Sequence, residues 1–446
     1  MVENGVLGQF LFHENAKTPT GTVLYEQHLK LIEKSRLADF AGYLMPLWFS
    51  SISAEHKAVR ETAGLFDCTH MGILEFDGRY AQSYLDAITT NNIKTLEIGR
   101  AKYSYILDAA GFVLDDIIIY RRKEDNFMVV VNAANKTKIL AWLQAVQNDK
   151  AIIDTQEPAR KLAEKTIVHD MLDDKGSVRF NLPESDCRVD IALQGPASKE
   201  LLSLMIDSLE DKQQFHDMKS FSLIETELNG INCIVSTTGY TGSKIGYELF
   251  VHPSKAAQLW AVLLEKGKPF GVVPCGLGAR DSLRIEAGLP LYGHELDGEF
   301  NINPFEAGYG WAVKLEKDFF VGRAAMQKKY QDYNMQVARI EFSGQAGIRP
   351  VRQHDGVLDT NGVCIGWVLS CAKINPLRSH IGEAGAKQIA LAYISKEIAE
   401  NENPVGLYYT ARSKMQVEKG KKSKVEINQK LEADISGTII TRFAKF

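Results

Sequence analysis

The stretch YSYILDAAGFVLDDIIIY, residues 103–120, predicts two β-strands joined by a turn. β-Branched and aromatic residues crowd both sides of a glycine-containing DAAG, which is typical of strands bounded by a tight turn. Because neighbouring residues on a strand point to opposite faces, Asp115 and Asp116 face opposite ways, and the other residues on both faces are apolar. At least one of these acids therefore lies among apolar neighbours, where a carboxylate is paired, protonated or used in chemistry.

The pairing of these two strands predicts a partner for one of the acids. If DAAG closes a tight loop with Asp108 opposite Gly111, Tyr103 lies directly across the ladder from Asp116, within side-chain contact distance. A bulged three-residue loop would shift this pairing by one residue. A phenol and a carboxylate on one apolar face form a candidate site; the alternative is a buried aspartate hydrogen-bonded to tyrosine or to backbone.

Helices alternate with strands on both sides of this hairpin. Apolar residues at helical spacing predict a helix near the start of the chain, a second from Ser53 to Gly64, and further helices beyond it. This alternation predicts an α+β architecture of the split βαβ kind, with antiparallel strands. Residues 151–190 are polar and weakly periodic, so we expect an elaborated connection there, after which helices and strands resume up to a helix over 276–288.

The pattern changes from about residue 336 to the end of the chain at 446. Short apolar strands, separated by Gly, Pro and charged loops, predict a small β-barrel or sandwich. The expected strands are VARIEF, GVCIGWVLS, QIALAYI, GLYYTA and GTIITRF. A lysine-rich stretch, residues 414–430, interrupts them and is expected to be a solvated surface loop.

Composition excludes several classes of function. A formal net charge of -4 over 446 residues offers no basic field for nucleic acid. The six cysteines form no C-x-x-C pair and the ten histidines show no metal spacing, which indicates reduced thiols and no metal site. The first residues lack the pattern of a secretory signal, and no apolar run reaches membrane-spanning length. We therefore expect a soluble, cytoplasmic protein of two or three domains without a membrane partner.

A second constellation lies in GYTGSKIGYELFVH, residues 239–252. Its glycines form a turn between two strands, but they do not match G-x-G-x-x-G and do not open a helix, which argues against a phosphate cradle. Glu248 follows this turn, which would let a ligand approach closely. From the residues alone, Glu248 is more typical of a surface acid on an edge strand.

A third constellation is the expected helix over 276–288, in which Arg280 and Arg284 are spaced i, i+4 and share one face. These arginines could bind an anionic ligand, or they could pair with Asp281 and Glu286. The sequence also lacks a Walker A motif and a G-x-S-x-G motif. Together with the absence of metal spacing, this disfavours nucleophilic and metal chemistry and leaves an α+β enzyme with a buried acid.

Four blocks of sequence, in order and at similar spacing, resemble one family: the aminomethyltransferases of glycine cleavage, or T-proteins, which bind tetrahydrofolate. The similarity extends over about residues 20–395. The blocks are LYEQHLKLIEKSRLADFAGYLMP (24–46), AEHKAVRETAGLFDCTHMG (54–72), GYTGSKIGYEL (239–249) and GLGARDSLRIEAGLPLYG (276–293). The hairpin of residues 103–120, ALQGP, NPFEAGYGWAVKL (303–315) and IGWVLS (365–370) fit the same family.

This resemblance implies a ring of three domains around a central folate channel. Residues 20–335 would form two interleaved α+β domains with antiparallel sheets, and residues 336–446 would form a C-terminal β-barrel. Tetrahydrofolate would enter the channel with its pterin inside, and the lipoyl arm of a carrier protein would deliver an aminomethyl group. The products would be methylene-tetrahydrofolate, ammonia and the dihydrolipoyl carrier.

The resemblance also assigns roles to individual residues. Asp116 corresponds to the catalytic aspartate of the family, which would stabilise positive charge near the reacting folate nitrogens and hold a proton for transfer. Glu248 corresponds to a glutamate that binds the pterin through paired hydrogen bonds. The full set of implied folate-binding residues is Glu248, Arg280, Tyr240, Tyr103, Asn132, Met71 and Trp311.

The chain departs from the family pattern at several positions. Ser243 stands where the family has an acid, in a turn that is one residue longer, and the basic residue near the C-terminus has only Arg442 as a counterpart. Two other functions therefore stay open. One is a folate-dependent demethylase of a methylated amine, ether or sulfonium compound. The other is a non-catalytic folate-binding protein, which should lack the acid at Asp116.

Overall fold

The computed structural model describes residues 6–13, 18–171, 186–343, 348–374 and 387–441. The chain divides into two compact units, each with hydrophobic clusters of its own. Unit 1 comprises Met1–Gly239, Ser243–Ala279 and Trp311–Lys328; unit 2 comprises Tyr240–Gly242, Arg280–Gly310 and Lys329–Phe446. Within the described ranges, no helix has both the length and the apolar character needed to span a bilayer.

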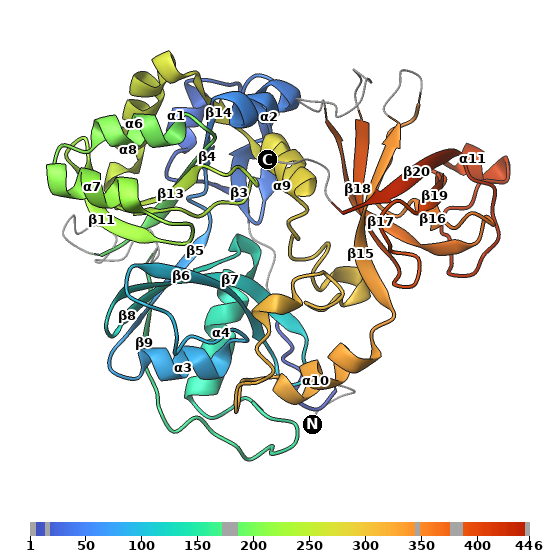
Figure 1. The fold of residues 1–446 in the computed structure, drawn as a ribbon, viewed down its shortest axis with the longest axis horizontal. Helices are drawn as coiled ribbons and strands as arrows, with labels where there is room; N and C mark the ends of the chain where they lie inside the picture. Colours follow the sequence, from blue (N-terminus) through green and yellow to red (C-terminus); the bar gives the residue numbers. More distant parts are fainter. Residues whose placement is uncertain (1–5, 14–17, 172–185, 344–347, 375–386, 442–446) are drawn as a thin grey trace. The chain divides into compact units, whose positions relative to one another are not determined.

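The hairpin of residues 103–120 belongs to a five-stranded antiparallel sheet of unit 1, in the order β6-β7-β8-β5-β9. Its strands are β5 (Gly72–Asp77), β6 (Arg100–Leu107), β7 (Val113–Lys123), β8 (Asn126–Val131) and β9 (Ile167–Asp170). Helices α3 (Ala81–Ile88) and α4 (Lys136–Gln147) lie against this sheet (Figure 1). Ile117 and Ile119 of β7 are buried in the cluster with these helices, whereas Tyr120 belongs to another buried cluster. Both faces of β7 are therefore covered, as its continuous apolar pattern predicted.

The register of β6 and β7 differs from the predicted one. Tyr103 lies opposite Ile118, and it is Tyr105 that lies opposite Asp116. The prediction that Tyr103 directly faces Asp116 is therefore wrong by two positions. Because diagonal neighbours on one face stay within reach of long side chains, Tyr103 still contacts Asp116.

Two single-residue shifts explain this register. The amide of Asp108 donates to the carbonyl of Phe112, so the turn contains three residues between the paired positions. A β-bulge between Ile106 and Leu107 then shifts the pairing by one more residue. Bulges insert one extra residue into one strand of an antiparallel pair, and nothing in the local sequence announced the second shift.

A six-stranded sheet of unit 1 carries Glu248, in the order β11-β12-β13-β10-β4-β14. Its strands are β4 (Ala63–Asp67), β10 (Val189–Gln194), β11 (Leu223–Leu228), β12 (Ile231–Ser236), β13 (Gly246–Val251) and β14 (Val272–Cys275). The helices around it are α2 (Ile52–Glu61), α6 (Ser198–Met205), α7 (Leu209–Asp217) and α8 (Pro253–Gly267). Only the β4–β14 pair of this sheet is parallel. The sheet thus confirms the α+β class.

The helix expected from Ser53 to Gly64 has different ends. Ser51 is its N-cap and accepts a hydrogen bond from the amide of Ala54, and the helix stops at Glu61. Gly64 is not a helix stop but part of β4, where an added Cβ would lie 2.5 Å from a methyl group of Val59. The glycine therefore permits close packing of strand on helix instead of ending the helix.

Smaller elements complete unit 1 and connect it to unit 2. A three-stranded sheet near the start of the chain contains β1 (Thr20–Gly21), β2 (Leu37–Phe40) and β3 (Tyr43–Pro46). The helices outside the two large sheets are α1 (Tyr25–Leu29), η1 (Lys34–Arg36), η2 (Ala133–Asn135), η3 (Lys268–Phe270), α9 (Leu277–Ala287), η4 (Gly298–Phe300), η5 (Gly310–Ala312) and α10 (Arg323–Asp332). Helices were expected at both α1 and α9, the first of them from apolar spacing.

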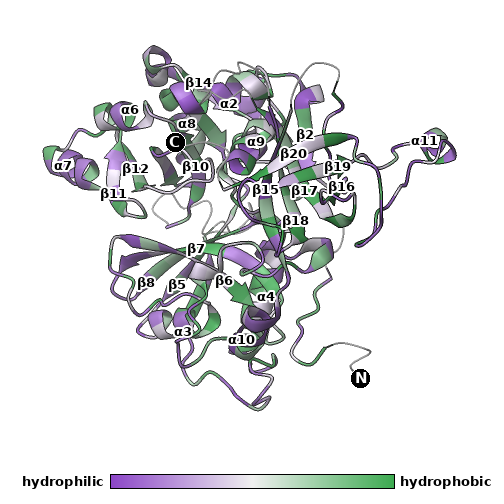
Figure 2. Ribbon diagram, turned by 45° about the vertical axis from the view of Figure 1, so that its right-hand side comes forward, coloured by the Kyte–Doolittle hydropathy of each residue, from purple (hydrophilic) through white to green (hydrophobic). Residues whose placement is uncertain are grey.

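Unit 2 contains a closed barrel in the order β15-β18-β17-β16-β19-β20. Its strands are β15 (Met335–Ser343), β16 (Gly356–Leu358), β17 (Cys364–Ile374), β18 (Lys387–Ser395), β19 (Pro404–Tyr408) and β20 (Ile435–Ile440). The barrel confirms one of the two predicted alternatives. The lysine-rich stretch 414–430 is mostly exposed, as expected, but it includes a short helix, α11 (Lys414–Glu418). Hydropathy colouring shows the apolar barrel strands and the polar segment that carries α11 (Figure 2).

Candidate active site

The acid pair lies on β7, and its deeper member is Asp115. This side chain is fully buried and accepts three hydrogen bonds. The backbone amide of Asn132 donates to Oδ2 at 2.9 Å, the side-chain amide of Asn132 donates to Oδ1 at 2.8 Å, and that of Asn135 donates to Oδ1 at 2.6 Å. Asp115 is thus held by the residues that connect β8 to α4.

Asp116 is the more accessible acid of the pair and is only partly buried. The hydroxyl of Tyr103 donates to its Oδ2 at 2.9 Å, and the side-chain amide of Asn132 donates to its Oδ1 at 2.8 Å. The NH2 group of Asn132 therefore bridges the two carboxylates. The contact predicted between Tyr103 and Asp116 is present, and Asn132 contacts the same acid.

The surroundings of the pair favour proton uptake. Burial, and after it the charge of Asp116, raise the pKa of Asp115 to about 7, against the hydrogen bonds from its amide donors. Burial also raises the pKa of Asp116 to about 6, although Tyr103 and Asn132 oppose the increase. Burial and the adjacent Asp116 raise the pKa of Tyr103 well above its usual value. Two adjacent acids of this kind can exchange a proton near neutral pH.

Aromatic rings flank this acid pair. The ring centroid of Trp311 lies 5.8 Å from that of Tyr103, and 55% of Trp311 is exposed. The ring of Tyr105 meets Tyr103 edge-on at 5.2 Å. An exposed indole beside a hydrogen-bonded phenol offers a flat apolar surface to a planar ligand.

Glu248 is not the exposed edge-strand acid that the residues alone favoured. It lies on β13, an interior strand between β12 and β10, and only 7% of it is exposed. The hydroxyl of Tyr120 donates to its Oε2 at 2.9 Å, and the hydroxyl of Thr238 donates to the same oxygen. Tyr120 and Thr238 were missed by the sequence reasoning, although Tyr120 shares a face of β7 with Asp116.

Tyr120 links the two candidate constellations within unit 1. It lies on β7, four residues beyond Asp116, and its hydroxyl reaches Glu248 on β13. Met71 packs against the same buried cluster as Tyr120, next to the start of β5. The acid pair and the buried glutamate are thus held by one strand and its neighbours.

Two of the expected residues lie in unit 2. The guanidinium carbon of Arg280 is 5.3 Å from the ring centroid of Tyr240, within cation–π distance. The hydroxyl of Tyr240 donates to the carbonyl of Pro290 at 2.6 Å. Arg442 lies outside the described residues, so its expected contact with the ligand stays a prediction.

Arg284 serves a different purpose from Arg280. It is 1% exposed, and its guanidinium pairs with Asp281 at 2.8 Å and with Glu295 at 2.6 Å and donates to the hydroxyl of Ser370 at 2.8 Å. The pairing alternative was therefore correct for Arg284, with Glu295 as the partner that sequence spacing did not identify. In the described residues, no group of His, Cys, Asp and Glu side chains is arranged to hold a metal ion.

The chain matches known proteins over most of its length. Residues 24–317 match the family described as the GCVT N-terminal domain. An aminomethyltransferase of Halalkalibacterium halodurans is 39% identical over 317 residues, which cover 71% of this chain and 75% of that protein. An aminomethyltransferase of Alkaliphilus metalliredigens is 35% identical over 397 residues, which cover 88% of this chain and 94% of that protein.

A solved structure agrees with these sequence matches. The glycine cleavage system aminomethyltransferase T of Bartonella henselae is similar with a TM-score of 0.69 and 25% identity, covering 95% of this chain and 98% of that chain. The fold and these matches together define a transferase of the α+β class. The chain belongs to the aminomethyltransferase family and is a transferase of the glycine cleavage system.

Proposed function

We propose that this enzyme transfers the methylene group of an aminomethyl-lipoyl carrier protein to tetrahydrofolate and releases ammonia, with Asp116 as the catalytic acid. The observation that carries the proposal is the acid pair on β7, in which Asn132 bridges Asp115 and Asp116 while Tyr103 hydrogen-bonds Asp116. In this pair Asp116 is the partly exposed member, so it is the carboxylate that a substrate can reach.

The transfer reaction needs a group that can stabilise positive charge on the substrate and can also take up a proton. Attack of a folate amine on the aminomethyl carbon develops positive charge on nitrogen, and a carboxylate nearby stabilises it. Because burial raises the pKa of Asp116 to about 6, the same group can take up a proton and return it near neutral pH. Asp116 can therefore act first as an anion and then as a proton carrier for the departing amine.

We assign the pterin to Glu248. The hydroxyls of Tyr120 and Thr238 both donate to Oε2 of Glu248. Among the described residues, none donates to its Oε1. That oxygen suits the amino group of a pterin, since a carboxylate forms strong paired hydrogen bonds with such donors. Trp311 and Tyr103 would stack on the flat part of the cofactor.

The remaining assignments follow the family. Arg280, Tyr240, Met71 and Asn132 would complete the folate contacts, Arg280 by its positive charge. Residues 20–335 would form the folate-binding region and residues 336–446 the barrel domain. The carrier would be the lipoylated protein of glycine cleavage, and the reaction would take place in the cytoplasm.

One assay tests the function and separates the alternatives. A lipoylated carrier loaded with aminomethyl should release ammonia and form methylene-tetrahydrofolate only when tetrahydrofolate and this enzyme are both present. If tetrahydrofolate binds but the loaded carrier gives no ammonia while a methylated amine, ether or sulfonium compound turns over, the demethylase alternative is correct. Binding of folate without turnover of either substrate would favour the non-catalytic alternative, against which the presence of Asp116 argues.

A further inference from the structure

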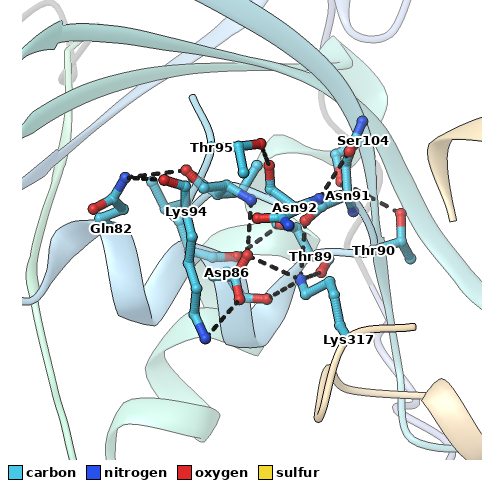
Figure 3. Close-up of polar contacts among 12 residues, drawn as sticks. Gln82, Asp86, Thr89, Thr90, Asn91, Asn92, Lys94, Thr95, Ser104 and Lys317 are labelled. Atoms are coloured by element: carbon cyan, nitrogen blue, oxygen red, sulfur yellow. Dashed lines mark hydrogen bonds and ion pairs between the residues drawn. The ribbon is translucent and has the colours of Figure 1, made fainter. Parts of the chain in front are cut away.

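A buried lysine outside the acid pair holds together the segment that follows α3. Lys317 is 8% exposed, and its ammonium donates to the carbonyls of Thr89 and Asn91, both at 2.9 Å, and to that of Asp86. It also pairs with the carboxylate of Asp86 at 3.2 Å. Figure 3 shows these contacts converging on one nitrogen. The N–H donors of Lys317 thus satisfy carbonyls at the C-terminal end of α3 and in the residues just after it.

The tied segment, residues 89–93, is also fixed from its other side. The amide of Ile93 donates to the carboxylate of Asp86 at 2.7 Å, so the acid that pairs with Lys317 also closes this segment. Asp86 is 5% exposed. A buried carboxylate and a buried ammonium are costly unless paired, and here each is paired with the other and with backbone.

From the tied segment, hydrogen bonds reach the candidate active site along two routes. The side-chain amide of Asn91 donates to the carbonyl of Tyr103 at 2.8 Å. The hydroxyl of Thr90 donates to the carbonyl of Ala312 at 2.9 Å, beside Trp311. Tyr103 hydrogen-bonds Asp116, and Trp311 packs against Tyr103. The carbonyl of Tyr103 and that of Ala312, the residue after Trp311, are thus both held by the segment that Lys317 binds.

We propose that Lys317 is a positioning residue of the transfer reaction, because it fixes residues 89–93 and thereby holds Tyr103 and Trp311 at the acid pair. This inference rests on the proposed function for its catalytic readout. Lys317 contacts neither acid itself; it acts through the Asn91 and Thr90 hydrogen bonds. Burial lowers the pKa of Lys317 to about 8, while Asp86 raises it, Lys94 lowers it and Glu316 raises it, so the ammonium form is available at neutral pH.

The principal variant is Lys317→Met, which keeps the length of the side chain and removes its charge and donors. The matched control is Lys94→Met, because Lys94 is exposed and its Nζ lies 4.0 Å from the same carboxylate of Asp86. The first readout is acrylamide quenching of Trp311 fluorescence, taken as the difference between each protein and the same protein carrying Trp311→Phe. Quenching of Trp311 should change in Lys317→Met and stay unchanged in Lys94→Met. Unchanged quenching in both would overturn the inference, whether or not folate binds.

The second readout is a double-mutant cycle with Tyr103→Phe in the aminomethyl transfer assay. Lys317→Met should lower kcat/KM by a factor on the order of 10², the scale of a small misplacement of reacting groups. If Lys317 acts through Tyr103, Tyr103→Phe costs much less in the Lys317→Met background than alone, and Lys317→Arg restores part of the rate. If Tyr103→Phe lowers kcat/KM by the same factor in both backgrounds, Lys317 does not act through Tyr103 and the inference is wrong.

A further variant keeps the inference testable if Lys317→Met does not fold. Thr90→Ala removes the bond to the carbonyl of Ala312, together with the contacts of the Thr90 hydroxyl with Ser104 and the amide of Tyr105, and leaves no charge buried. It should change the quenching of Trp311 and lower kcat/KM in the same direction. A Thr90→Ala protein with unaltered quenching and unaltered kcat/KM would contradict the proposed route. Lack of any folate binding by the unmodified protein would instead contradict the proposed function and leave the quenching comparison to decide this inference.

Discussion

The two acids of β7 are neighbours in sequence but differ in what surrounds them. Asp115 is enclosed by three amide donors, whereas Asp116 meets a phenol and one shared amide and is partly exposed. Strand alternation predicted that the two would face different surroundings. It did not predict that the amide of Asn132 would join them, because that bond depends on where β8 ends beside β7.

At the residue scale, the first prediction separates charge from shape in Asp116. Asp116→Asn keeps the size of the side chain and removes its charge, so folding and tetrahydrofolate binding should persist. Turnover should fall by a factor on the order of 10² or more, as expected when a positioned acid–base group is lost. Steady-state rates with circular dichroism on the same samples measure both properties. Wild-type turnover in Asp116→Asn would remove Asp116 from the catalytic role.

A second prediction concerns Asp115, whose substitution should act mainly on stability. Asp115→Asn places an NH2 group where the amides of Asn132 and Asn135 already donate. A buried donor left facing donors costs about 1–3 kcal/mol of unfolding free energy. Urea denaturation should show this loss, with Asp116→Asn as the matched variant that shows a smaller one. Should Asp115→Asn be as stable as the parent while abolishing turnover, the roles of the two acids would be exchanged.

At the scale of elements, the sequence predicted the strands and helices of the site well but not their neighbours. Local apolar patterns identified β6, β7, β12 and β13, since alternation and turn residues are local signals. Whether a strand is at an edge or in the interior depends on pairing between distant segments. β13 pairs with β10, more than fifty residues earlier in the chain, and with β12. That pairing buries Glu248, and local sequence could not reveal it.

The interior position of β13 leads to a third prediction. Glu248→Gln should weaken tetrahydrofolate binding by about 1–3 kcal/mol, because an amide cannot accept paired hydrogen bonds from the pterin as a carboxylate does. Glu225→Gln on β11 is a suitable control, since Glu225 is partly exposed and pairs with Arg122 instead. Titration calorimetry of both variants measures the difference. An unchanged dissociation constant in Glu248→Gln would move the pterin contact to another residue.

At the scale of the whole molecule, the acid pair affects stability as a function of pH. The pKa values of Asp115 and Asp116 are raised to about 7 and about 6, above the ordinary value of 3.8. The folded state therefore binds more protons than the unfolded state between these limits, and the pair's contribution to stability is lost as pH rises through about 6 to 7. Above this pH range the ionised pair therefore costs folding free energy.

This linkage gives the fourth prediction. Asp116→Asn removes one titrating acid and also the charge that raises the pKa of Asp115. The unfolding free energy of this variant should therefore depend less on pH between pH 4 and pH 7 than that of the parent. The difference between the two proteins isolates the pair from other acids such as Asp67, for which burial acts to raise the pKa but the hydrogen bond and charge of His28 lower it below its usual value. Denaturation curves at several pH values measure both slopes. Parallel slopes would mean that the pair is not the source.

The closed barrel of unit 2 affects where the sequence of this chain can evolve. Every barrel strand is hydrogen-bonded to two neighbouring strands. The hydrogen bonding of the barrel therefore does not depend on the loops that connect its strands. Lengthening a loop costs little, about 0.6 kcal/mol for each doubling of its length. The segment 414–430 is one such connection, between β19 and β20, and it is mostly exposed. Barrel loops are therefore where new sequence can accumulate and be tried by selection while the acid pair on β7 stays untouched.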